Sequence, residues 1–521
     1  MKRFNTTGLC VPRKHYMADI SGKLAKIKEL IDRECYFTMN RARQYGKTTT
    51  LAALERALKD EYIMVSISFQ GFGIRSFESP EAFCQAFIGH IAEAIRFTSA
   101  AKEYADGWLN DKVSDFDVLS RHITAMCEGK KVVLMIDEVD KTSNNVIFLH
   151  FLSMLREKFL ARENDRDYTF HSVILAGVYD IKNIKLKMVQ EGAYTPSEGE
   201  DKIYNSPWNI AVNFTVDMSF DPKEIASMLR EYEGDHKTGM DIAAVAAEIH
   251  GYTSGYPFLV SRICQCIDEE QGGDWTIKGV QSAIKLILVE TNTLFDDVIK
   301  NLENSKELSD YIYELLILGR ASSFVVYDSV VSIGVRYGFF RNVNGRVAIS
   351  NRIFELLMTD YFMEKDLRAK KQVVGVLQYD VVRNGRFDME LCLRKFARHY
   401  AEIYSAEDGA FLERHGRLLF LSYLKPLING QGFYHIESAF TDLRRMDIVV
   451  DYGRQQFIVE LKRWYGEARQ GEGYEQLLGY MGSKGADAGY MLTFDFREPG
   501  GRVRKAEWAE FGGKRIFDVI V

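Results

Sequence analysis

The sequence of 521 residues is poor in the residues that break or cross-link a chain, with 8 prolines and 7 cysteines. The cysteines are odd in number and scattered, and no pair of CxxC motifs occurs. The sequence therefore predicts neither a disulfide framework nor a structural zinc site, and a reducing cytoplasmic setting is expected. An apolar fraction of 46% and a charged fraction of 27% exclude collagen-like, low-complexity and wholly disordered chains. Residues 1–14 lack an apolar core and no run of about 18 apolar residues follows, so we expect no signal peptide and no membrane span.

The net charge of −6 excludes a uniformly basic nucleic-acid coat, but the charge is uneven. Residues 1–360 carry 42 Lys+Arg against 50 Asp+Glu, whereas residues 361–521 carry 25 against 23. The acidic excess therefore belongs to the first two thirds of the chain. The length predicts about three folded units, which we place at residues 1–220, 221–365 and 366–521.

In the first unit, short β runs alternate with helical patterns, which predicts an α/β fold with a mostly parallel sheet covered on both faces. The expected strands are residues 35–39, 63–69, 131–136 and 171–177, and the expected helices are residues 20–32, 48–58, 79–97 and 146–162. From Asp221-Pro222 the pattern becomes mainly helical. Asn344-Gly345 then suits the turn of a hairpin, which favours a helical lid with a winged helix that serves either as a packing lid or as a DNA contact.

A candidate phosphate-binding loop lies between a β run and a helix, where residues 40–49 read NRARQYGKTT. Lys47 would neutralise the β- and γ-phosphates and the Thr48 hydroxyl would ligate magnesium. Arg41 stands where the GxxxxGK[ST] pattern has its first glycine, so a basic turn with a threonine cap is the alternative. The other nucleotide-binding candidates in the loop are Gln44, Tyr45, Gly46 and Thr49.

Two acids, Asp137 and Glu138, directly follow the apolar run of residues 132–136. Ligands bind at the carboxyl ends of such strands. Asp137 is therefore expected to hold the magnesium ion, and Glu138 to polarise the attacking water during phosphoryl transfer.

With the loop and this acidic pair, residues 5–360 resemble the AAA-like P-loop ATPases of the STAND and archaeal-ATPase group. Two further segments carry the resemblance, Ala176-Gly177-Val178 and Gly255-Tyr256-Pro257-Phe258. The second is similar to the Gly-x-Pro motif of that group, which implies that Pro257 lies near the nucleotide base. The resemblance also implies ATP and Mg²⁺ as ligands, and a homo-oligomer with an arginine acting in trans.

The last unit places Asp447 at the start of one β run and Glu460 and Lys462 in the next. A hairpin would bring the two carboxylates together, and residues 460 and 462 would share one face of the sheet. Two carboxylates make a site for magnesium or manganese, and Lys462 would then orient hydroxide or stabilise the transition state. An exposed Glu-Lys pair is the alternative, but the apolar residues of the segment 457–461 indicate a buried strand.

This Asp-x12-Glu-x-Lys pattern resembles the PD-(D/E)XK nuclease superfamily over residues 375–521, although Met446 replaces the usual proline. By that resemblance Gln476 and Tyr480 match the motif of the following helix, with Gln476 facing the site, and Glu413 matches an extra metal-binding acid. A charge cluster around Trp464 and Tyr465 is either a phosphate track or a solvated face. It comprises Arg444, Arg445, Lys462, Arg463 and Arg469.

The favoured hypothesis is an ATPase fused to a magnesium-dependent nuclease that cuts DNA rather than RNA. Such fusions resemble parts of mobile-element or phage-defence machinery. The first alternative is a STAND-type switch whose nucleotide state controls a nuclease-fold effector or a catalytically silent binding domain. The second is an inactive ATPase fold that serves as a scaffold.

Overall fold

The chain, described by a computed structural model, divides into two compact units. The first comprises Met1–Val298, Tyr327–Arg341 and Ile349–Phe354, and the second comprises Ile299–Val326, Asn342–Ala348 and Glu355–Val521. No helix within the described ranges is both long enough and apolar enough to span a bilayer. The described residues are 2–96, 108, 111–142, 146–178, 208–317, 322–369, 381–403, 413–428, 432–438, 446–453, 455–464, 467–495, 497 and 503–521.

A parallel sheet organises the first unit, with strand order β1-β4-β3-β2. Its strands are β1 (Tyr36–Asn40), β2 (Ile63–Ser68), β3 (Val132–Asp137) and β4 (Ser172–Gly177). Each starts and ends within a residue or so of the predicted run, which confirms the α/β prediction. Because β4 lies between β1 and β3, the loop after β1 and the acids after β3 flank the carboxyl end of β4.

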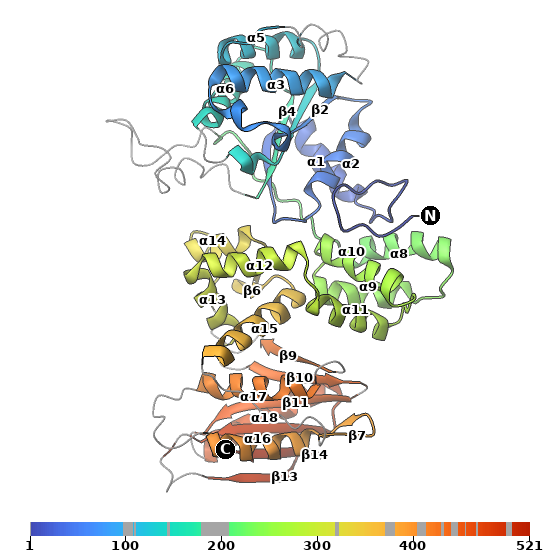
Figure 1. Ribbon diagram of the computed structural model, residues 1–521, viewed down its shortest axis with the longest axis vertical. Helices are drawn as coiled ribbons and strands as arrows, with labels where there is room; N and C mark the ends of the chain where they lie inside the picture. The colour runs from blue at the N-terminus through green and yellow to red at the C-terminus, as the bar shows by residue number, and fades with distance from the viewer. Residues whose placement is uncertain are drawn as a thin grey trace. The chain divides into compact units, whose positions relative to one another are not determined.

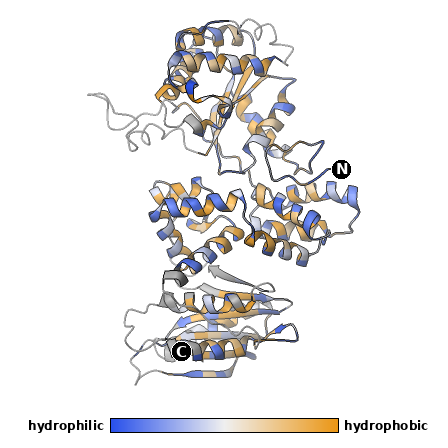
Figure 2. Cartoon of the chain, viewed as in Figure 1, coloured by the Kyte–Doolittle hydropathy of each residue, from blue (hydrophilic) through white to orange (hydrophobic). Residues whose placement is uncertain are grey.

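Helices cover both faces of this sheet, as Figure 1 shows. One hydrophobic core packs against α3 (Pro80–Ile95), α5 (Phe116–Cys127) and α6 (Val146–Arg162), and the other against α1 (Ser21–Asp32) and α2 (Lys47–Leu58). In Figure 2 the strands are mostly orange, because parallel strands are buried on both faces. The sequence analysis did not predict α5, although Asp115 caps it through the N–H of Val118.

The remaining helices of the chain's middle follow the predicted start at Asp221, which caps the next helix with Glu224 in a capping box. Asn344 and Gly345 have φ of 51° and 80°, which confirms the predicted hairpin turn. The assignment to a winged helix stays a prediction. The elements are α8 (Pro222–His236), α9 (Ile242–Thr253), α10 (Pro257–Gln265), α11 (Ile277–Val289), α12 (Thr293–Asn304), α13 (Lys306–Leu316), α14 (Ser329–Arg336), β5 (Phe340–Val343), β6 (Arg346–Ile349) and α15 (Arg352–Ala369).

The second unit contains a separate mixed sheet with strand order β13-β14-β12-β11-β10-β9. Strands β9, β10 and β11 form an antiparallel meander, whereas β11, β12 and β14 are parallel. The parallel step from β11 to β12 needs a crossover, which α18 supplies. The elements are β7 (Val382–Arg383), β8 (Arg386–Phe387), α16 (Met389–Ile403), α17 (Glu413–Ile428), β9 (Gly432–Ser438), β10 (Met446–Tyr452), β11 (Gln455–Arg463), α18 (Glu467–Lys484), β12 (Ala488–Phe494), β13 (Lys505–Phe511) and β14 (Lys514–Ile520).

Candidate functional site

The predicted phosphate-binding loop connects β1 to α2. Its tight path uses two residues in the left-handed region, Gln44 with φ of 56° and Gly46 with φ of 76°. Gly46 is the N-cap of α2 and has no side chain with which to accept a hydrogen bond. The first N–H groups of α2 therefore receive no side-chain cap, and a helix start of this kind suits an anion.

Lys47 and Thr48, the first residues of α2, point back to the loop and to β3. The Lys47 amine donates to the carbonyl oxygens of Arg41 and Ala42, at 2.8 and 2.9 Å. Burial lowers the pKa of Lys47, and the negative charges of Asp140, Asp137 and Glu138 partly offset this by raising it. The Thr48 hydroxyl donates to Asp137 Oδ2 at 2.5 Å. The structure thus brings together the hydroxyl and the carboxylate that the sequence analysis had assigned to one magnesium ion.

The acids after β3 differ in their surroundings. Asp137 is buried and its Oδ1 accepts the N–H of Glu138 at 2.8 Å, whereas Glu138 is exposed and has a φ of 57°. Asp140, which no sequence pattern indicated, also belongs to this turn, and its Oδ2 accepts the backbone N–H of Val178 at 2.6 Å. A Cβ on Gly177 would lie 2.8 Å from Val139 and 2.9 Å from Asp140 Oδ1, so only glycine fits there. These contacts tie the end of β4 to the acidic turn.

Arg41, the residue that departs from the usual loop pattern, anchors the loop. Its guanidinium donates to the carbonyl oxygens of Asn40 and Val216, at 2.8 and 2.7 Å, and lies 5.3 Å from the centre of the Phe214 ring. Arg41 does not adopt a positive φ. The backbone of this loop therefore does not require glycine at position 41.

Helix α12 and Tyr256, the N-cap of α10, hold the middle of the loop. Arg43 pairs with Asp297 at 3.1 Å, and Gln44 donates to the Thr293 hydroxyl at 2.7 Å. The Tyr256 hydroxyl donates to the carbonyl oxygen of Arg43 at 2.5 Å. The ring of Tyr45 meets that of Tyr256 edge-on at 4.6 Å between centroids. A change in the conformation of the loop would therefore alter its contacts with α12 and with the start of α10.

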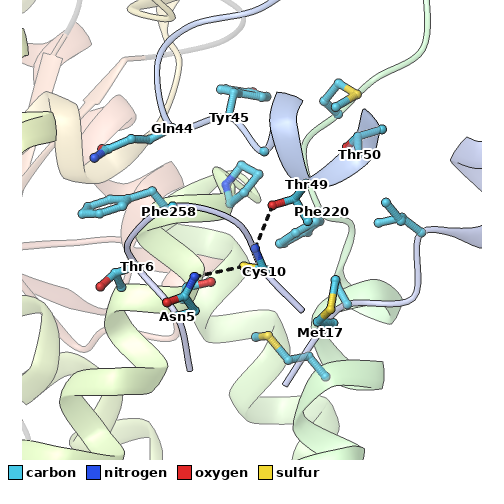
Figure 3. A pocket seen from close by; sticks show the side chains of 18 of the residues that line it. Asn5, Thr6, Cys10, Met17, Gln44, Tyr45, Thr49, Thr50, Phe220 and Phe258 are labelled. Atoms are coloured by element: carbon cyan, nitrogen blue, oxygen red, sulfur yellow. Dashed lines mark hydrogen bonds between the residues drawn. The ribbon is translucent and has the colours of Figure 1, made fainter. Parts of the chain in front are cut away.

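A cavity of about 380 Å³ adjoins the loop, and Figure 3 shows Gln44, Tyr45 and Thr49 at its wall. Pro257 lines it and lies 3.9 Å from the place where a Cβ on Gly46 would stand. Residues 5–20, which no sequence motif indicated, also line the cavity. Within this segment, the backbone N–H of Cys10 donates to the Thr49 hydroxyl at 3.2 Å. The lining residues are Asn5, Thr6, Thr7, Gly8, Cys10, Tyr16, Met17, Ala18, Ile20, Lys23, Gln44, Tyr45, Gly46, Thr49, Thr50, Met218, Phe220, Met228, Pro257, Phe258, Ser261 and Thr293.

Residues 13–272 match the family model of an AAA-like domain, a range that includes the loop, both acids and Pro257. The chain carries an AAA-like P-loop ATPase domain. P-loop ATPases of this kind use ATP with Mg²⁺, and the oxygen donors of Thr48 and Asp137 fit that ion. The family match stops before the second unit, so it says nothing about a nuclease.

Among curated proteins, an uncharacterised WD repeat-containing protein of Synechocystis is 23% identical over 351 residues, which cover 62% of this chain. The chain spans about 27% of the length of that relative. Among solved structures, a Walker-type ATPase of Pyrococcus abyssi aligns with a TM-score of 0.46 at 12% identity, over 68% of this chain and 99% of that chain. The ORC2 protein of Aeropyrum pernix aligns with a TM-score of 0.38 at 11% identity, over 67% of this chain and 96% of that chain.

Outside the AAA-like domain, the antiparallel pairing of β10 and β11 sets Asp447 directly opposite Glu460. This confirms the predicted hairpin and its register. Lys462 lies two residues after Glu460 on the same face, and its amine is 2.9 Å from Glu460 Oε1 and 2.9 Å from Gln476 Oε1 of α18. Glu437 of β9, which no sequence motif indicated, is paired with Asp447 on the other side of β10.

The burial of Glu460 distinguishes this arrangement from an exposed ion pair. Glu460 is 1% exposed, and its neighbours Ile458 and Val459 are fully buried. A buried carboxylate is costly unless a cation or a metal compensates its charge. Lys462 supplies one such charge, and its side chain is 17% exposed. Carboxylate oxygens at this position suit a hard divalent cation.

Several predicted residues lie outside what the structure describes. For four of them the structure describes the backbone but not the side chain; they are Glu413, which begins α17, Asp447, Arg463 and Arg469. Arg444, Arg445 and Tyr465 lie outside the described residues altogether. Within the described part of the chain, no three His, Cys, Asp or Glu side chains gather as metal ligands. Tyr480 packs against the hydrophobic cluster under α18, which is a packing role.

Proposed function

We propose that this chain couples an ATP-hydrolysing AAA-like domain to a magnesium-dependent nuclease that cuts DNA. The observation that carries the nuclease half is the pairing of Asp447 with Glu460 in a buried part of the sheet, beside a lysine held by Gln476. The AAA-like domain supports the other half through its family match and its loop geometry.

In the ATPase half, the base of ATP would enter the cavity of about 380 Å³ beside Pro257. The N–H groups at the start of α2 and the Lys47 amine would bind the phosphates. Thr48 and Asp137 would hold Mg²⁺, which neutralises charge on the phosphate oxygens. Glu138, exposed at the end of β3, would orient the attacking water.

In the nuclease half, Asp447 and Glu460 would hold Mg²⁺ or Mn²⁺, with Glu413 as a third acid. The bound ion would acidify water and polarise the scissile phosphate. The Lys462 amine is fixed between Glu460 and Gln476, both at 2.9 Å. In that position Lys462 would stabilise the charge that develops on the phosphate oxygens, and Gln476 would keep its amine in place.

The test is cleavage of single-stranded, duplex and branched DNA by the full chain with Mg²⁺ or Mn²⁺, with and without ATP. We expect Asp447→Ala, Glu460→Gln and Lys462→Ala each to lower the cleavage rate at least about 100-fold, as removal of a main charge-stabilising group does. Glu475→Gln, an exposed acid on α18, is the control and should cut normally. Equal cleavage by Glu460→Gln and the parent would refute the nuclease.

A second function is favoured by the contacts between the loop and helix α12. Because Arg43 and Gln44 of the loop bind Asp297 and Thr293 of α12, the state of the nucleotide can be passed to this helix. The chain would then act as a nucleotide-controlled switch, with the second unit as its effector or as a silent binding domain. Tight nucleotide retention and a change of oligomer size on adding ATP would favour the switch. Fast turnover stimulated by DNA would count against it.

A further inference from the structure

A tryptophan and an arginine meet at the end of the strand that carries Glu460 and Lys462. Trp464 directly follows β11, and its backbone N–H donates to the carbonyl oxygen of Phe494 at 2.9 Å, which continues the pairing of β11 with β12. Side chains alternate along a strand, so Trp464 follows Glu460 and Lys462 on one face. At roughly 3.3 Å per residue, Trp464 lies about 7 Å beyond Lys462 along the strand.

The guanidinium of Arg497 lies 5.3 Å from the centre of the Trp464 ring. A buried acid sets this position, because Asp495 is bound at 2.9 Å by Nε and at 2.6 Å by Nη2 of Arg497. Burial opposes the ionised form of Asp495, but the bonds from Arg497 and from the N–H of Val503 hold the pKa of Asp495 below its usual value. The Asp495 side chain is fully buried, whereas that of Arg497 remains 46% exposed.

A partly exposed indole beside a fixed guanidinium is an arrangement on which nucleic-acid bases stack. We propose that Trp464 and Arg497 form a stacking platform for an unpaired base that flanks the scissile phosphate. The proposal rests on the proposed nuclease function and narrows its substrate to DNA that is single-stranded or branched at the cut.

The platform is placed to act on the strand that reaches Lys462. Both Trp464 and Lys462 are at the carboxyl end of β11, and the amine of Lys462 is already directed to Glu460 and Gln476. A base held on Trp464 would therefore fix the next phosphates of the same strand near these two side chains. Trp464 and Arg497 are positioning residues in this account, because neither contacts the reacting atoms.

The test measures the binding of fluorescein-labelled single-stranded and duplex DNA to the full chain in Ca²⁺, with cleavage in Mg²⁺ measured in parallel. Trp464→Leu keeps an apolar side chain without a π-face, and Trp464→Phe keeps the π-face. Base stacking on an aromatic ring contributes about 1–3 kcal/mol, so we expect Trp464→Leu to weaken single-strand binding about 5- to 150-fold. Trp464→Phe should lose much less, and duplex binding should change less than about twofold in both.

The control is Trp508→Leu, because Trp508 also stacks on an arginine, Arg515 at 4.3 Å, but lies on β13 at the edge of the same sheet. It should bind single strands normally. Equal single-strand binding by Trp464→Leu and the parent would overturn the platform, as would equal losses for Trp464→Leu and Trp464→Phe. If the parent cuts no DNA, the nuclease proposal itself fails, whatever the Trp464 variants show.

Discussion

Gly338, two residues before the first strand of the β5–β6 hairpin, makes close contact with the phosphate-binding loop. Its φ is +75°, and a Cβ at this position would stand 2.8 Å from the Cβ of Ala42. Ordinary carbon contacts are about 3.5–4.0 Å, so Gly338→Ala must displace the buried Ala42. The carbonyl oxygen of Ala42 accepts a hydrogen bond from Lys47. The substitution should therefore perturb the residue that is proposed to bind the phosphates.

The expected loss of stability has two parts. A left-handed conformation costs an L-residue about 1–2 kcal/mol, and overpacking adds about 1–3 kcal/mol, which gives about 2–5 kcal/mol for Gly338→Ala. Gly239 in the same unit has the same φ of +75°, but no atom lies within 4 Å of the place where its Cβ would stand. Gly239→Ala should therefore lose only the about 1–2 kcal/mol that the left-handed conformation costs.

Denaturant unfolding measures this difference in stability, and titration with a fluorescent ATP analogue measures the affinity of the loop for the nucleotide. We expect Gly338→Ala to raise the Kd for ATP about tenfold, which corresponds to about 1.4 kcal/mol, and Gly239→Ala to leave it unchanged. The reasoning would be refuted if both variants lost equal stability and bound ATP alike, because the contact with Ala42 would then have no consequence.

Three further substitutions test separate parts of the account. Asp167→Asn leaves the amine of Lys158, whose side chain is 3% exposed, without its carboxylate partner at 2.5 Å, and should cost about 3–5 kcal/mol at pH 7. Burial opposes ionisation of Asp167, but the bonds from Lys158 and Thr124 lower its pKa. The stability of the parent should therefore fall as the pH drops below about 4, and this fall should be smaller in Asp167→Asn. Identical acid unfolding curves of the two proteins would contradict the role assigned to Asp167. Gln476→Ala should lower DNA cleavage about tenfold at unchanged DNA affinity, because it removes one of the two side chains that hold the Lys462 amine; a change in affinity alone would argue for a binding role. Arg41→Gly should cost about 1–3 kcal/mol of stability, because it removes the bond to Val216 and the contact with Phe214; a more stable variant would show that Arg41 does not anchor the loop.

The parts of the site that the sequence predicted are those with a strong local signal. The apolar run of β11 and the turn at Gly453, with φ of 60°, fixed the register that sets Asp447 against Glu460. Likewise, an apolar strand pattern followed by a short motif predicted the phosphate-binding loop and the acids after β3. In both cases residues near in sequence determine the geometry.

The missed features depend on contacts between distant segments. Residues 5–20 have no regular hydrophobic period, so their place in the cavity could not be read from the pattern. Asp140 is recognisable only from its bond to Val178, which directly follows the neighbouring strand β4. The hairpin of β13 and β14 did carry a signal, because Gly512-Gly513 has φ of 56° and 77° and suits such a turn.

The central claim is that one chain joins an ATPase to a nuclease, and it is tested most directly by comparing the parent with Glu460→Gln and Lys47→Ala in one assay. DNA cleavage and ATP hydrolysis are measured together in Mg²⁺ and ATP. The account predicts that Glu460→Gln loses cleavage at least about 100-fold and still hydrolyses ATP, whereas Lys47→Ala loses ATP hydrolysis. Cleavage by Glu460→Gln at the parent's rate would contradict it.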